Sequence, residues 1–148
     1  MSFKNVNMNK IPNDLRDFDF NWSSCALEHL GGIKEALNFI CNNLDTLRSG
    51  GLAVHTTEFN LSSNHDTLNE PRACILREKD IIRIIDKLRK KGHYVYPLDL
   101  RKGQLPGDKW VDVPNFGENY NSLERKTHLR FLIYSYITTS IGLIIKKK

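Results

Sequence analysis

The stretch that decides the fold is residues 18–54, which read FDFNWSSCALEHLGGIKEALNFICNNLDTLRSGGLAV. Apolar and polar residues alternate at 18–23, which is typical of a strand. Apolar residues then recur at three- and four-residue steps over 33–47, so that they line one face of a helix. The glycine pair at 50–51 ends that helix, because glycine tolerates the left-handed conformation that follows a last turn. We therefore predict a strand–helix–strand unit whose second strand occupies 52–59.

The rest of the chain extends this unit in both directions. An apolar face predicts a second helix at 78–91, and strands are predicted at 3–8, 94–100 and 129–145. A chain of this length makes one domain, which we assign to residues 1–148. The alternation of strands and helices predicts an α/β fold, in which a mostly parallel sheet carries helices on its faces and ends in an antiparallel strand.

Charge and hydropathy argue against two classes of partner. The 22 basic and 17 acidic residues give a net charge of +5. Some of the excess basic residues are the three lysines at 146–148. Others, at 87–91, complement the dipole at the C-terminal end of a predicted helix. Nucleic-acid binding usually needs a basic stripe on one element and is not favoured. Residues 129–145 contain Arg130 among several polar residues and are a poor membrane span.

The cysteines point to a reducing compartment. Cys25, Cys41 and Cys74 form no C-x-x-C pair, so a disulfide framework and a structural zinc site are both disfavoured. The first residues, MSFKN, lack the apolar core of a signal peptide. We therefore expect a cytoplasmic protein.

Three segments together resemble class I S-adenosylmethionine-dependent methyltransferases. Residues 18–30 are similar to the family's fourth strand and following turn, of the form F-D-x-V-x-S-x-x-x-L-E-H-L. Residues 47–54 are similar to the L-K-P-G-G stop before its fifth strand, with Ser49 in place of the usual proline. Residues 139–144, TSIGLI, are similar to its last antiparallel strand. The resemblance covers nearly the whole chain and implies a Rossmann-like methyltransferase sheet.

The sequence departs from the family at the cofactor loop. The family's run D/E-x-G-x-G-x-G, in which glycines let the backbone approach the ligand, is absent, as is the acidic residue that binds the ribose. Met1 falls just before the position of the third strand. The resemblance therefore implies an incomplete sheet, truncated at its N-terminus relative to the family, and a site for S-adenosylmethionine that needs completion.

The resemblance assigns cofactor contacts to five residues. Asn7 and Met8 stand where the family contacts adenine; the Asn7 carbonyl can accept a hydrogen bond there, without the charge of the usual acid. Ser23, Ser24 and Cys25 follow the fourth strand and would face the methionine part of the cofactor. The alternatives are a simple strand end at Asn7 and a small buried residue at Cys25.

Catalysis is predicted at Glu28 and His29, which the resemblance places at the lip of the cofactor pocket. Histidine titrates near neutrality, so His29 is suited to take a proton from an acceptor group while Glu28 orients it. The alternative is that both residues anchor the start of the following helix.

Contacts to the methyl acceptor are predicted in and just after the strand at 52–59 and on a long connection at 101–127. The residues are His55, Glu58, Asn60 and Trp110. His55 also fits a buried core histidine, and Trp110 equally fits an oligomer contact or a small core beneath the long connection. The spacing of His29, His55 and His65 matches no metal motif, so no metal site is predicted.

Two functions follow from these residues. The first is a methyltransferase-like protein that acts on a small molecule or sugar and is incomplete or inactive alone. The alternative is a non-catalytic remnant of that fold, or an oligomeric assembly module. A sheet without its first strands leaves unpaired edges, so we expect a homo-oligomer held through exposed sheet edges.

Overall fold

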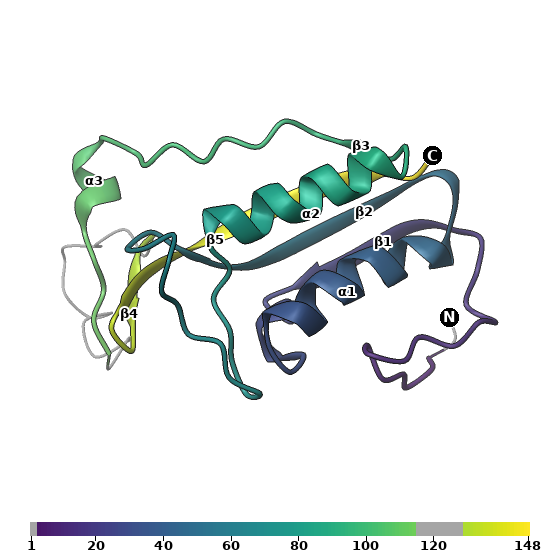
Figure 1. The fold of residues 1–148 in the computed structure, drawn as a ribbon, viewed down its shortest axis with the longest axis horizontal. Helices are drawn as coiled ribbons and strands as arrows, with labels where there is room; N and C mark the ends of the chain where they lie inside the picture. The colour runs from purple at the N-terminus through teal and green to yellow at the C-terminus, as the bar shows by residue number, and fades with distance from the viewer. Residues whose placement is uncertain (1–2, 115–128) are drawn as a thin grey trace.

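The computed structural model describes residues 3–114 and 129–148 (Figure 1). In chain order its elements are β1 (Phe18–Ser24), η1 (Leu27–His29), α1 (Ile33–Asn43), η2 (Leu44–Thr46), β2 (Leu47–Asn60), α2 (Glu78–Lys90), β3 (Tyr94–Val95), α3 (Pro106–Lys109), β4 (Phe131–Ile133) and β5 (Tyr136–Lys146). The predicted helix at 78–91 is confirmed by α2. The predicted connection at 101–127 contains the short helix α3, and its residues 115–127 lie outside the described part of the chain.

The sheet is mixed and mostly antiparallel. Its strand order is β1-β2-β5-β3, and β4 pairs with β5 off this path. β1 and β2 run parallel, β5 is antiparallel to β2, and β3 and β4 are antiparallel to β5. The prediction of a mostly parallel, Rossmann-like sheet is therefore wrong.

Two features of the chain explain the difference. Residues 3–8, predicted as a strand, adopt no strand, so they add no further parallel partner to the sheet. The long strand β5 pairs with β2 continuously from Leu52 to Asn60 and so occupies the position beside it. A parallel neighbour requires a crossover connection. Among the described elements, only α1 connects two neighbouring strands in this way.

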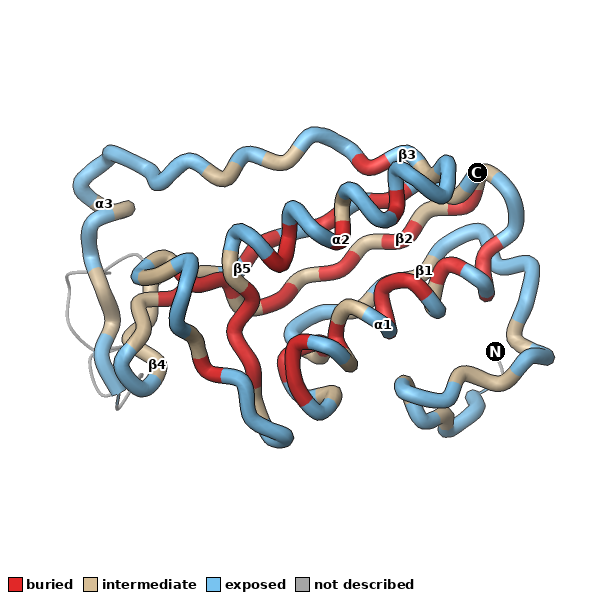
Figure 2. Tube along the Cα trace, viewed as in Figure 1, coloured by how far each residue is buried: buried red, intermediate tan, exposed pale blue. Residues whose placement is uncertain are grey.

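The core lies between the sheet and the two longer helices, which cover the same face of it (Figure 1). Along β2 the residues Ala53, His55, Thr57 and Phe59 are buried, whereas the residues between them are half-buried. This alternation is the two-residue period of a strand with one covered face. Ile141, Leu143 and Ile145 continue the buried face on β5, and Figure 2 shows buried and half-buried residues alternating along β2.

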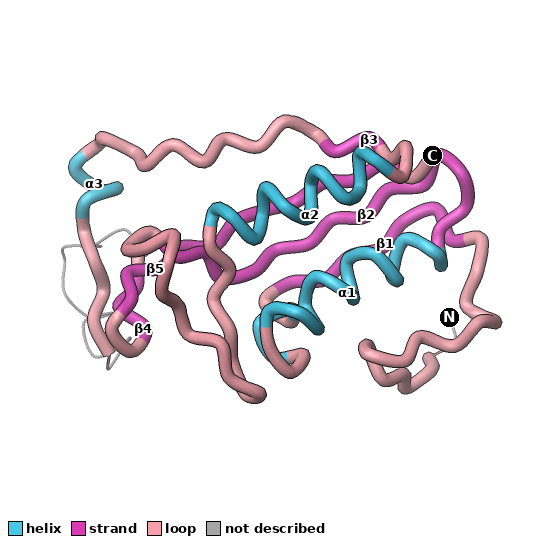
Figure 3. The backbone as a smooth tube through the Cα atoms, viewed as in Figure 1, coloured by secondary structure: helices cyan, strands magenta, loops and turns pink. Residues whose placement is uncertain are grey.

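Strand lengths differ from the predictions at three places. β2 begins at Leu47, because α1 ends at Asn43 and only a single 3-10 turn separates them. β3 stops at Val95, ahead of Pro97, which cannot donate a ladder hydrogen bond. The strand predicted at 129–145 divides into β4 and β5 at a turn that contains Tyr134 with a φ of 54° (Figure 3).

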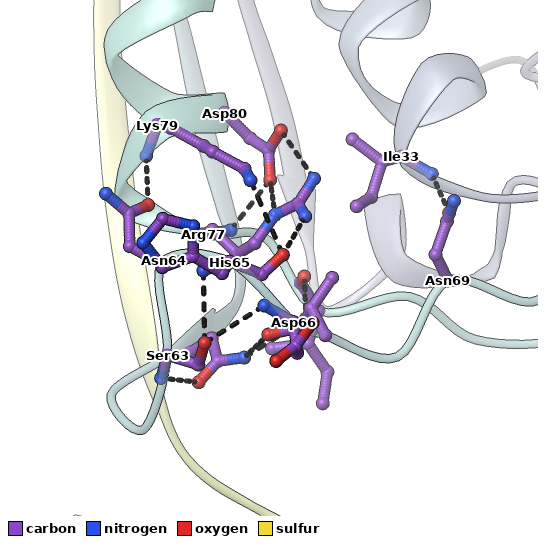
Figure 4. A network of polar contacts seen from close by, with 12 residues as sticks. Ile33, Ser63, Asn64, His65, Asp66, Asn69, Arg77, Lys79 and Asp80 are labelled. Carbon is purple, nitrogen blue, oxygen red and sulfur yellow. Dashed lines mark hydrogen bonds and ion pairs between the residues drawn. The ribbon is translucent and has the colours of Figure 1, made fainter.

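The loop between β2 and α2 is held by polar side chains (Figure 4). Asn60 accepts hydrogen bonds from the backbone N–H groups of Ser62 and Ser63, at 2.8 and 2.9 Å. Asn69 accepts one from the backbone N–H of Ile33 at 2.9 Å, and so satisfies the start of α1, where Gly32 has no side chain to do so. The loop thereby fixes the position of α1 under the sheet edge.

No helix in residues 3–114 and 129–148 is long and apolar enough to cross a bilayer.

Candidate functional site

The candidate site lies where the parallel strands β1 and β2 end. Cys25 directly follows β1 and has a φ of 46°, which turns the chain sharply away from the strand. Its backbone N–H donates to the carbonyl of Thr56 at 3.1 Å, and the Thr56 hydroxyl donates to that of Ser24 at the same distance. These bonds tie the turn after β1 to β2. The carboxyl ends of parallel strands are the usual place for ligands in open sheets that contain them.

An acidic cluster occupies this edge. The thiol of Cys25 and carboxylate oxygens of Glu28 and Glu58 all lie within 4.8 Å of one another. Glu28, in η1, is only 5% exposed and accepts a hydrogen bond from the Thr57 hydroxyl at 3.2 Å. Glu58, on β2, is half-buried, and its Oε2 atom has no hydrogen-bond partner among the described residues. The cluster therefore brings two carboxyl groups and a thiol together and contains a buried oxygen atom without a hydrogen-bond partner in the described part of the chain.

The electrostatics of Glu58 reflect this crowding. Burial raises the pKa of its carboxyl above the ordinary value, and the neighbouring carboxylate of Glu28 raises it further. The Thr138 hydroxyl and the charge of His29 lower the same pKa. Glu58 thus keeps a proton more readily than an exposed glutamate and lies within electrostatic reach of His29.

His29 lies at the outer rim of the cluster. Its side chain is exposed, and Nδ1 is 2.9 Å from the carbonyl oxygen of Arg72. A carbonyl can only accept, so Nδ1 carries the hydrogen and Nε2 is left as the basic nitrogen of the neutral ring. This tautomer suits a general base. Of the predicted pair, Glu28 thus lies beside Cys25 and Glu58, whereas His29 acts on Glu58 only through its charge.

His55 and Ser23 lie on the covered face of the sheet, opposite to the face of Glu58. His55 is 1% exposed, its Nδ1 is 2.7 Å from the Ser23 hydroxyl, and its ring meets that of Phe39 edge to face at 5.8 Å. Burial lowers the pKa of His55 to about 4. The ring is thus a neutral member of the core, which the alternation of β2 directs away from Glu58.

The remaining predicted residues are spread over the fold. Asn60 is buried and organises the loop after β2. Trp110 is 41% exposed, in the segment after α3, and its indole N–H donates to Asp112 at 2.8 Å. Asn7 is exposed and accepts from the backbone N–H of Asn9 at 2.9 Å, while Met8 packs against the core.

One contact brings the N-terminal segment toward the site. The Asn9 side chain donates to the carbonyl of Leu30 at 2.7 Å, in the loop that follows His29. Residues 7–9 are thereby tied to the chain that leaves η1.

Sequence reasoning missed the residues that support the site. Thr57 holds Glu28, and the carbonyl of Arg72 sets the tautomer of His29. Thr57 could have been found, because it is a polar residue in phase with the buried face of β2 and therefore needs a buried hydrogen-bond partner. Backbone acceptors such as Arg72 leave no signal in side-chain patterns.

Comparison with known proteins adds no relative. Neither a protein-family model nor a curated protein matches this chain. The interpretation of the site therefore depends on its residues and their geometry.

Proposed function

We propose that the chain is an S-adenosylmethionine-dependent methyltransferase-like protein whose described residues supply the methionine side of a cofactor site. One observation carries the proposal. Cys25, Glu28 and Glu58 converge at the carboxyl edge of the parallel pair β1 and β2. Cys25 and Glu28 belong to the segment whose sequence resembles the turn that faces the cofactor in that family.

The acidic cluster suits part of this cofactor. The methionine end of S-adenosylmethionine carries two positively charged groups, a sulfonium and an ammonium, and one carboxylate, so its net charge is positive. Carboxylates are favourable partners for such groups, and those of Glu28 and Glu58 lie together at this edge of the sheet. For the adenosine end we identify no comparable binding residues, because residues 1–148 contain no G-x-G-x-G run. The proposed protein is therefore incomplete or inactive by itself.

The chemistry assigned to the chain is positioning and proton transfer. The bound cofactor would supply a methyl group for in-line displacement by an acceptor oxygen or nitrogen. Nε2 of His29 would take the proton that the acceptor loses, and Glu58 would stabilise the charged imidazole. The acceptor we propose is a small molecule or a sugar, in the cytoplasm.

Calorimetric titration with S-adenosylmethionine and S-adenosylhomocysteine tests the proposal. We expect measurable binding, weakened about tenfold for S-adenosylmethionine by Glu58→Gln, since one charge-assisted contact is worth about 1.4 kcal/mol. Glu70→Gln is the matched control, because Glu70 is an exposed glutamate in the loop after β2. Absence of binding by the unaltered chain at millimolar ligand would contradict the cofactor assignment.

The second candidate function is an oligomeric assembly module. β1 is the first strand of the sheet order, and among the described residues nothing pairs with its outer edge. Open strand edges invite pairing with another copy. A homo-oligomer through this edge is the form of assembly that the strand order favours, and a measured mass of one chain would contradict it.

A further inference from the structure

The face of the sheet opposite the helices carries two rows of apolar side chains. Directly paired residues share a face, so the register places Trp22, Val54 and Ile144 side by side. Tyr96 extends this row, because its N–H bonds to the Ile144 carbonyl at 3.0 Å. The next row contains Phe20, Leu52, Lys146 and Tyr94. We call these eight residues the open face.

Aromatic rings at both margins dominate the open face. Phe20 and Trp22 on β1 are 55% and 69% exposed, and Tyr94 and Tyr96 at the other margin are 55% and 40% exposed. The two tyrosine rings meet edge to face at 4.9 Å, which confirms that they point to the same side. Both longer helices cover the opposite face (Figure 1). Exposed aromatic residues gathered in this way mark an interaction surface.

The area matches what a homodimer needs. Aromatic side chains have roughly 150–250 Å² each to bury, so the four rings expose on the order of 400 Å². A standard interface buries about 800 Å² per partner, of which about 65% is apolar in homodimers. Ile144, which is 41% exposed, and the half-buried Leu52 and Val54 bring the open face close to that apolar share.

The arrangement of the rows identifies the occupant. Across the strands, the first row reads aromatic, aliphatic, aliphatic, aromatic, from Trp22 to Tyr96. The second row, from Phe20 to Tyr94, reads the same way if the methylene stem of Lys146, its third member, is taken as the second aliphatic group. A two-fold axis that runs parallel to the strands, between β2 and β5, therefore stacks each row of one chain on the same row of the second chain. Trp22 would meet the partner's Tyr96, and Phe20 the partner's Tyr94, as an isologous interface requires.

We propose that the open face binds the open face of a second copy of this chain. The two sheets would pack as a sandwich about 10 Å apart, in the aligned geometry of stacked sheets. This contact differs from pairing through the edge of β1, because it also uses β3 and β5. It requires no cofactor, so it is independent of the methyltransferase proposal.

Sedimentation equilibrium of the full chain tests this proposal. The expected mass is twice the 17.1 kDa of one chain, and Trp22→Lys and Tyr96→Lys should each return it to that of one chain. Tyr134→Lys is the control; Tyr134 is 72% exposed in the turn between β4 and β5, away from the open face. Circular dichroism should show that all three variants keep the secondary structure of the unaltered chain.

Tyr96→Lys separates the two kinds of dimer. Pairing through the β1 edge would not involve Tyr96, so a dimer that survives this substitution would overturn the open-face proposal. A mass of one chain for the unaltered protein at every concentration tested would overturn it as well.

Discussion

At the scale of single residues, His55 makes folding depend on pH. Burial lowers its pKa from 6.5 to about 4 in the folded chain. A base whose pKa falls on folding stabilises the protein fully above its ordinary pKa, and that stability is lost as the pH falls. We expect the free energy of unfolding to drop by up to about 3 kcal/mol between pH 6.5 and 4, as 1.36 kcal/mol per pKa unit implies.

Urea unfolding at a series of pH values measures this dependence. His55→Gln should flatten the curve in that range, because glutamine does not titrate. His65→Gln, at an exposed histidine in the loop after β2, should leave the slope unchanged. Equal slopes in His55→Gln and the unaltered chain would show that another group causes the dependence.

At the scale of elements, the start of α2 depends on Asp80. Its carboxylate accepts from the backbone N–H of Arg77 at 3.1 Å and from the Arg77 guanidinium at 2.7 and 3.2 Å (Figure 4). The Asp80 and Arg77 side chains are 8% and 18% exposed. Loss of one partner of a buried pair costs about 3–5 kcal/mol. We expect Asp80→Ala to destabilise the protein by about 3 kcal/mol in urea unfolding.

Asp86→Ala provides the matched control on the same helix. Asp86 is exposed, and a surface substitution of this kind changes stability by about 0.5 kcal/mol or less. Similar losses in the two variants would mean that the Arg77 contact does not account for the effect of Asp80→Ala.

The same elements show how far sequence reasoning reaches. The helical faces of α1 and α2, and the alternation along β2, are local periodicities that burial produces directly, so they were predictable. The order of strands in the sheet is not local. Which strand lies beside β2 depends on the pairing of Leu52 to Asn60 with residues more than 75 positions later in the chain. Likewise, Glu28 and Glu58 were predicted separately as site residues, but no sequence pattern predicts that their carboxylates lie close together.

At the scale of the whole molecule, the proposed dimer predicts that stability depends on protein concentration. One face is covered by α1 and α2, whereas the open face is covered by nothing in the described part of the chain. If the dimer is the folded form, unfolding also separates two chains, and the melting temperature rises with concentration. Each tenfold increase in protein concentration is worth about 1.4 kcal/mol per dimer, or about 2 °C in melting temperature for two chains of this size.

Melting curves of the unaltered chain should show this trend, and Trp22→Lys should melt at one temperature whatever its concentration. A melting temperature of the unaltered chain that does not vary with concentration would argue for a folded monomer whose aromatic face remains in water.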